Sequence, residues 1–181
     1  MEKLQEFLAL LTGEFDNREQ FDAMQAAGKE YPFAEHRNTL VNERITGLPE
    51  GFSGAFLLEE STYTTGGARR PSCHLFLFTE EAEGIRLTSY ELPEGAGQSV
   101  TAADFPVTAY EALVPSRKFT PALYRERDGV WEGGSDSEFA PGLTFHLWES
   151  FGPDRLEVSE QMERGGRRIF GYDEPICYKR I

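Results

Sequence analysis

Apolar positions at helical spacing open the chain. They recur three and four residues apart and form one stripe of an amphipathic helix: Leu4, Phe7, Leu8 and Leu11. Gly13 follows at a point where a helix can end on a left-handed residue. An acceptor with an N3 partner then marks a second helix, which Gly28 can end: Asn17 with Gln20, or Asp16 with Glu19. The pattern predicts a helical corner that covers one end of a larger structure.

From residue 31 onward, apolar and polar residues alternate in short segments, as they do in half-buried strands. Turns rich in Gly, Pro and Asp divide these segments, and Asp128-Gly129 is the clearest two-residue hairpin turn. The predicted strands are 36–45, 54–63, 72–78, 85–92, 107–114, 122–127, 130–133, 143–151, 155–162, 168–172 and 176–180. Segment 72–78 carries large apolar residues at consecutive positions, so we expect both of its faces to be covered.

About ten strands in succession, separated by turns at this spacing, are typical of an antiparallel barrel or sandwich. We favour the barrel because closure leaves no strand edge unpaired. A barrel of this size encloses more space than side chains readily fill, so we expect it to hold a ligand, with the two N-terminal helices over one mouth. No repeat or change in composition divides the chain, which predicts a single domain over residues 1–181.

Composition and charge narrow the class of protein. The chain has 18 Lys and Arg against 31 Asp and Glu, a net charge of −13. Such a surface disfavours nucleic acid and anionic membranes as partners. There are two cysteines, no signal-peptide pattern, and no apolar run of about 18 residues. These features predict a cytoplasmic protein with reduced thiols.

The segment 13–20 also carries a resemblance to a known family. Its pattern, Gly13-Glu14-Phe15-x-Asn17-x-x-Gln20, resembles the opening of the CpcT/CpeT-type phycobiliprotein lyases. Those proteins attach linear tetrapyrroles (bilins) to cysteines of light-harvesting proteins. The resemblance implies a calycin-like barrel, a phycocyanobilin-like bilin as ligand or substrate without a tightly bound cofactor, an acceptor phycobiliprotein, and a homodimer. Capping explains Gly13 and Asn17 equally well.

Carboxylates share a strand face with apolar residues on three predicted strands. The three sets are Phe56, Leu58 and Glu60; Phe145, Leu147 and Glu149; and Leu156, Val158 and Glu160. If the apolar members point inward, the acids lie in or at the rim of the cavity, where burial raises a carboxyl pKa and makes the group a proton donor. Alternatively, each acid lies at a strand end in water. Glu60 is the candidate catalytic residue, because segment 59–63 resembles the family's Glu-Gln-x-Tyr motif.

The resemblance implies further ligand-binding residues. Segment 68–75 stands where the family has Pro-Tyr-Arg-x-Arg, a run suited to bidentate binding of bilin propionates. Arg69 matches the first arginine and Arg70 can replace the second, although Ala68 and Pro71 depart from the motif. The alternative is two solvated arginines on a turn. The candidate ligand-binding residues are Tyr63, Arg69, Arg70, His74, Tyr90, Trp148 and Glu160.

Other chemistries lack a pattern in this sequence. Cys73 and His74 are adjacent, so on a strand they face opposite ways and cannot act as nucleophile and base. The histidines have no metal-ligand spacing with the cysteines, and no metal site is expected. Two functions stay open. The first is a bilin lyase-like protein, in which a carboxylate such as Glu60 protonates a positioned bilin. The second is a non-catalytic, lipocalin-like binder of a small apolar or tetrapyrrole ligand.

Overall fold

The computed structural model describes residues 2–181 and consists mainly of β-strands. Its helices are α1 (Glu2–Leu11), α2 (Arg18–Ala26) and the short 3-10 helices η1 (Asn42–Arg44) and η2 (Tyr110–Ala112). Its strands are β1 (Gly13–Asp16), β2 (Phe33–Leu40), β3 (Ile45–Thr46), β4 (Ala55–Thr65), β5 (Ala68–Glu81), β6 (Gly84–Tyr90), β7 (Thr108–Ala109), β8 (Ala122–Arg127), β9 (Val130–Ala140), β10 (Leu143–Phe151), β11 (Leu156–Arg164), β12 (Arg167–Phe170) and β13 (Ile176–Arg180).

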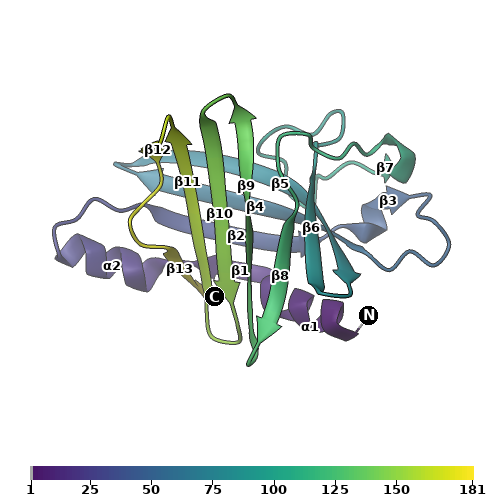
Figure 1. Ribbon diagram of the computed structural model, residues 1–181, viewed down its shortest axis with the longest axis horizontal. Helices are drawn as coiled ribbons and strands as arrows, with labels where there is room; N and C mark the ends of the chain where they lie inside the picture. Colours follow the sequence, from purple (N-terminus) through teal and green to yellow (C-terminus); the bar gives the residue numbers. More distant parts are fainter. Residues whose placement is uncertain (1) are drawn as a thin grey trace.

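Within residues 2–181, ten strands form one closed antiparallel barrel (Figure 1). Around the ring they follow the order β10-β9-β8-β6-β5-β4-β2-β1-β13-β11, and β11 pairs with β10 along its whole length to close it. β12 pairs with the end of β11, while β3 and β7 pair with each other outside the barrel. The mainly β class and the calycin-like barrel predicted from the sequence are therefore confirmed.

Several strand boundaries differ from the sequence pattern, and the predicted strand 36–45 ends at Leu40 before η1. The predicted strand 130–133 runs on to Ala140 as β9, with Gly133 and Gly134 inside it. A Cβ atom at Gly134 would lie 2.0 Å from the Leu147 carbonyl oxygen, so the glycine reflects close backbone approach within the sheet rather than a turn. Of the predicted strand 107–114, only the two residues of β7 are paired as a strand, and η2 follows them.

Helix α1 closes one end of the barrel. All four residues of its predicted apolar stripe are buried. Phe7 is fully buried, and its ring centroid lies 4.9–5.4 Å from the rings of Phe78, Tyr124, Trp131 and Phe151. Because these aromatic rings come from four different strands, α1 fastens to the barrel wall on several sides. The expectation that an N-terminal helix covers one mouth is confirmed for α1.

For α2 that expectation is wrong. None of its residues is buried, and the helix lies along β13 and β2 on the outside of the barrel (Figure 1). The two helices are separated by β1 instead of a turn. Phe15 of β1 pairs with His36 on one side and Arg180 on the other. This strand therefore completes the ring, and it leads the chain out of the mouth before α2 begins.

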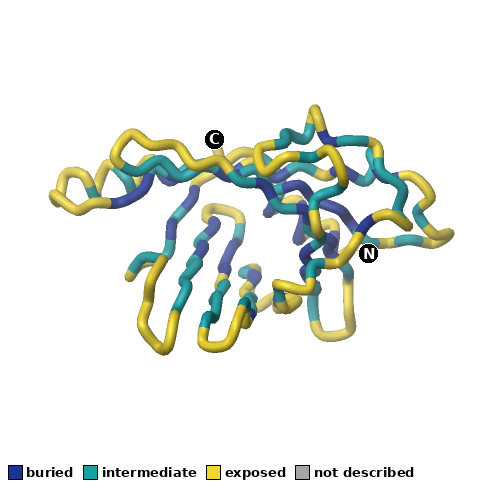
Figure 2. Tube along the Cα trace, turned by 90° about the horizontal axis from the view of Figure 1, so that it is seen from above, coloured by how far each residue is buried: buried dark blue, intermediate teal, exposed yellow. Residues whose placement is uncertain are grey.

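Strands β4 and β5 are covered on both faces. Their outward residues Phe56, Leu58, Leu75 and Leu77 form a second core with residues from segments 41–54 and 93–113. Their inward residues include Leu57 and Phe78, which belong to the barrel core. The double coverage predicted for 72–78 is confirmed. Figure 2 shows the buried positions concentrated along the strands and the exposed ones in the hairpin turns.

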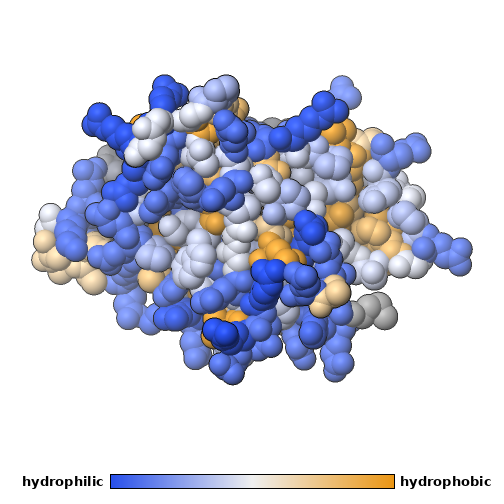
Figure 3. Space-filling view, in the orientation of Figure 1, coloured by the Kyte–Doolittle hydropathy of each residue, from blue (hydrophilic) through white to orange (hydrophobic). Residues whose placement is uncertain are grey.

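The surface of the molecule fits the acidic composition. Figure 3 shows one face, over β9, β10 and β11, that is largely hydrophilic with small apolar areas between polar side chains. None of the helices in residues 2–181 combines the length and the apolar character needed to cross a bilayer.

Candidate functional site

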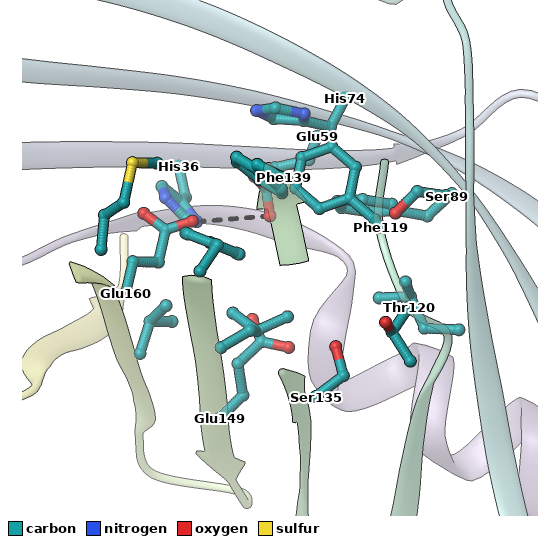
Figure 4. Close-up of a pocket in the computed structure, with 16 residues that line it drawn as sticks. His36, Glu59, His74, Ser89, Phe119, Thr120, Ser135, Phe139, Glu149 and Glu160 are labelled. Carbon is teal, nitrogen blue, oxygen red and sulfur yellow. Dashed lines mark ion pairs between the residues drawn. The ribbon is translucent and has the colours of Figure 1, made fainter. Parts of the chain in front are cut away.

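The barrel encloses a cavity of about 180 Å³ whose walls are mainly apolar. Among the residues that line it in the described chain, five have titratable side chains, each from a different strand (Figure 4): His36 of β2, Glu59 of β4, His74 of β5, Glu149 of β10 and Glu160 of β11. Successive residues of a strand face opposite sides, so the barrel places these five groups inside and their chain neighbours outside.

Two histidines and Glu59 face one another across neighbouring strands. Glu59 pairs in register with His74, and the Nδ1 atom of His36 lies 3.8 Å from the Oε2 atom of Glu59 (Figure 4). This separation is too long for a hydrogen bond. In the part of the chain that the structure describes, neither imidazole has a hydrogen-bond partner. The ring of His74 instead stacks on Phe76, with centroids 5.9 Å apart.

The other two carboxylates are held by tyrosines. The hydroxyl of Tyr124 donates a hydrogen bond to Oε2 of Glu149. The hydroxyl of Tyr63 donates to Oε2 of Glu160 at 3.2 Å, and Tyr178 donates to Tyr63 at 3.5 Å. These hydrogen bonds fix two of the three acids, while Glu59 has only the longer contact with His36.

Burial favours the uncharged form of all five groups. It raises the pKa of Glu149 to about 7, partly offset by the hydrogen bond from Tyr124. Burial, and then the charges of Glu149 and Glu160, raise the pKa of Glu59 well above its usual range, and burial raises that of Glu160. Burial lowers the pKa of His36 to about 3, with a smaller effect of His74, and it also lowers the pKa of His74. The surroundings of the cavity therefore favour protonated acids and neutral imidazoles.

Aromatic side chains surround the end of the cavity opposite α1. Phe151 of β10 contacts Phe7, whereas Phe145 lies six residues earlier on the same inward face, toward the other end. The Phe119 ring lies 5.2 Å from that of Phe139 and 5.8 Å from that of Phe145. We call Phe119, Phe139 and Phe145 the aromatic mouth.

Three of the residues predicted from the sequence face the interior. His74 and Glu160 line the cavity, and Tyr63 adjoins it through its hydrogen bond to Glu160. The inward faces predicted for 143–151 and 155–162 are also correct, since Leu147, Glu149 and Val158 line the same cavity.

The structure places Glu60 outside the cavity, contrary to the expected inward position. Its side chain lies on the outer face of β4, where it accepts a hydrogen bond from the Ala102 amide at 3.3 Å. The sequence argument chose the face of Phe56 and Leu58 as the inner one, but that face packs in the second core. The interior carboxylate of this strand is the preceding residue, Glu59.

Four further candidates lie outside the cavity. Tyr90 packs against the Phe56 ring in the second core, at 5.4 Å between centroids, and the outward-facing Trp148 is exposed. Arg69 is exposed and pairs with Glu35 at 3.5 Å, and Arg70 is exposed near the turn of the β4–β5 hairpin. The arginines thus have the solvated position of the alternative interpretation.

Sequence reasoning missed His36, Glu59 and the aromatic mouth. A signal for Glu59 was present, because counting in steps of two from Tyr63 passes through Ser61 to Glu59 and assigns all three to one face. For Phe119 no such signal exists, since it precedes β8 in an irregular segment.

Comparison of the chain with known protein-family models and with curated proteins gives no match. Within residues 2–181, no cluster of three or more His, Cys, Asp or Glu side chains has the geometry to hold a metal ion.

Proposed function

We propose that the protein is a non-catalytic, lipocalin-like carrier that binds a small apolar ligand inside its barrel. The observation that carries the proposal is the cavity of about 180 Å³ between α1 and the aromatic mouth. Binding sites for small molecules are typically concave and mainly apolar, with a few convergent polar groups. Because an engineered cavity of about 150 Å³ binds benzene, we expect a ligand of one ring with a short substituent.

Calorimetric titration with 2-phenylethanol, a neutral probe of this size, tests the proposal. Ser135 lines the cavity, so Ser135→Leu should fill part of it and weaken binding by at least about tenfold. The matched control is Glu138→Leu, an exposed position on the same strand, which should bind as the wild type does. Bound probe should also raise the melting temperature, because a ligand of the native state stabilises it. Equal binding by both variants would place the site elsewhere.

A bilin lyase-like activity is a second candidate, favoured by the three interior carboxylates. Burial raises the pKa values of Glu59, Glu149 and Glu160, and a general acid whose pKa lies near the working pH is suited to protonating a substrate. The resemblance of residues 13–20 points to a linear tetrapyrrole. One pyrrole ring would fit the cavity, and the remainder would lie over the aromatic mouth. In this scheme Glu59 takes the role first assigned to Glu60.

Incubation with phycocyanobilin separates the two candidates. A lyase-like protein should change the bilin absorbance spectrum at tens of micromolar ligand and transfer the bilin to a cysteine of a phycobiliprotein subunit. A spectral change without transfer favours the carrier, and no change rejects the lyase. Sedimentation of the purified chain tests the homodimer that the resemblance implies.

A further inference from the structure

The cavity contains acids and imidazoles but no basic side chain opposite them. Of its lining residues in the described chain, none is Lys or Arg. His36 is 6% exposed and points into the cavity, yet it has no hydrogen-bond partner there. An imidazole that faces a cavity without a hydrogen bond can bind the polar group of a ligand. Its position beside Glu59 indicates where the polar group of a ligand would lie (Figure 4).

We propose that the natural ligand is an apolar primary amine, whose ammonium group binds Glu59 beside His36 and His74 and whose hydrocarbon part extends toward the aromatic mouth. This inference rests on the proposed carrier function and specifies its ligand class. An ammonium group offers three N–H donors. One can reach the Glu59 carboxylate, and the acceptor nitrogens of the two neutral imidazoles can take the others.

The charges around the cavity favour a ligand with an ammonium group over one with a carboxylate. The titratable groups that line the cavity, together with the tyrosines hydrogen-bonded to them, come from seven strands: His36, Glu59, Tyr63, His74, Tyr124, Glu149, Glu160 and Tyr178. A ligand carboxylate would meet three acids and no Lys or Arg among the lining residues, whereas an ammonium group meets a charge-assisted acceptor. Lys118 lies at the mouth, with its Nζ atom 4.2 Å from the centroid of the Phe139 ring, and its charge adds to the lowering of the His74 pKa by burial. The net charge of −13 also attracts cations to the molecule.

Charge balance gives the inference a pH dependence. When the ammonium group enters, the carboxyl group facing it ionises and releases its proton to solvent, so the bound pair is neutral overall. Binding therefore releases up to one proton, and the affinity rises by up to about tenfold per pH unit while the acids are still protonated. It levels off once the free amine loses its own proton. A neutral ligand releases no proton and shows no such slope.

Three ligands of one shape test the inference by calorimetry at pH 7.5: 2-phenylethylamine, 2-phenylethanol and phenylacetate. We expect the amine to bind at least about tenfold more tightly than the alcohol, and phenylacetate to bind more weakly than either. Titrations of the amine in buffers of different ionisation enthalpy should report the released proton. Equal affinity of alcohol and amine overturns the amine inference but leaves the carrier function standing. Failure of all three probes rejects both.

Substitutions locate the ammonium group. Glu59→Gln keeps the shape and removes the charge, so it should weaken amine binding by at least about tenfold and leave alcohol binding within about twofold. Glu60→Gln, the next residue on the outer face, is the matched control and should change neither. If Glu59→Gln does not fold, the inference is tested by the wild type alone, through its proton release and its order of affinity for the three ligands. Unchanged amine binding by a folded Glu59→Gln overturns the assignment.

Discussion

Asn17 and Gln20 join the N-terminal segment to the barrel through both ends of their amide groups. The Nδ2 of Asn17 donates to the Pro32 carbonyl at 3.0 Å, and its Oδ1 accepts from the Ala34 amide at 2.8 Å. Gln20 makes an equivalent pair of hydrogen bonds, since its Nε2 donates to the Pro175 carbonyl and its Oε1 accepts from the Cys177 amide, at 2.9 Å each. The side chain of Asn17 therefore does not cap α2, as the capping interpretation expected. The pattern in 13–20 has a structural explanation, at a distance from the cavity.

Loss of the Asn17 amide should be costly, because it leaves two buried backbone groups without partners. We expect Asn17→Ala to lower the free energy of unfolding by about 2–4 kcal/mol, measured by urea denaturation. Gln25→Ala, an exposed amide on α2, is the control and should change it by no more than about 0.5 kcal/mol. Similar losses in both variants would contradict the structural role of Asn17.

Glu149 should make the protein less stable as the pH rises. Its pKa in the folded state is about 7, against an ordinary 4.5, so between these values the folded state keeps a proton that the unfolded chain releases. The stabilisation is complete below pH 4.5, falls as the pH rises through 7, and amounts to roughly 3 kcal/mol. The free energy of unfolding, measured by urea denaturation, should fall less between pH 5 and pH 8 in Glu149→Gln than in the wild type.

The exposed Glu132→Gln serves as the control for this experiment and should lose stability as the wild type does. His36 has a lowered pKa and therefore destabilises the fold as the pH falls below 6.5. This effect is the same in the wild type, Glu149→Gln and Glu132→Gln, so it cancels when their unfolding free energies are compared. An identical pH dependence in Glu149→Gln and the wild type would mean that Glu149 is ionised in the folded state.

At the scale of elements, the sequence predicted strands well where one face is polar. β10 and β11 alternate apolar with polar residues, so their inward faces, with Glu149 and Glu160, were assigned correctly. β4 is apolar at four successive positions because an outer core covers it. Such a strand has no polar side to mark the outside, and the choice between Glu59 and Glu60 then depends on long-range packing. The alternation groups Glu59 with Tyr63 and Glu60 with Phe56, but it does not say which of the two groups faces the cavity.

Close contact between β9 and β10 explains why Gly134 lies within a strand. A Cβ atom there would lie 2.0 Å from the Leu147 carbonyl oxygen, so Gly134→Ala must push the two strands apart. We expect it to destabilise the fold by about 1–3 kcal/mol in thermal or urea denaturation. Gly97→Ala, at a site with open space and no left-handed backbone, is the control and should change stability little. Equal stability of the two variants would show that the strands accommodate the methyl group.

For the whole molecule, ring closure depends on segments from the two ends of the described chain. β1 pairs with β13, and β13 in turn pairs with β11. β13 also contributes Ile176 and the fully buried Tyr178 to the barrel core. Without this strand, β1 and β11 would each lose a neighbour, and the core would open to water.

Removal of residues 176–181 should therefore abolish the cooperative unfolding transition observed by circular dichroism. The control is removal of Ile181 alone, which is 73% exposed and should leave the transition within a few degrees of the wild type. A shortened chain that still melts sharply at the original temperature would show that the ring is stable without its last strand.

The same pairing has a consequence for how the chain folds during synthesis. Since β1 is made first among the strands and its partner β13 last, the cylinder cannot close on the ribosome until nearly all of the described residues have emerged. Until then β1 has one edge without a neighbour, and such edges are prone to intermolecular pairing. The nascent chain is thus a stage at which the unpaired edge of β1 is open to other chains.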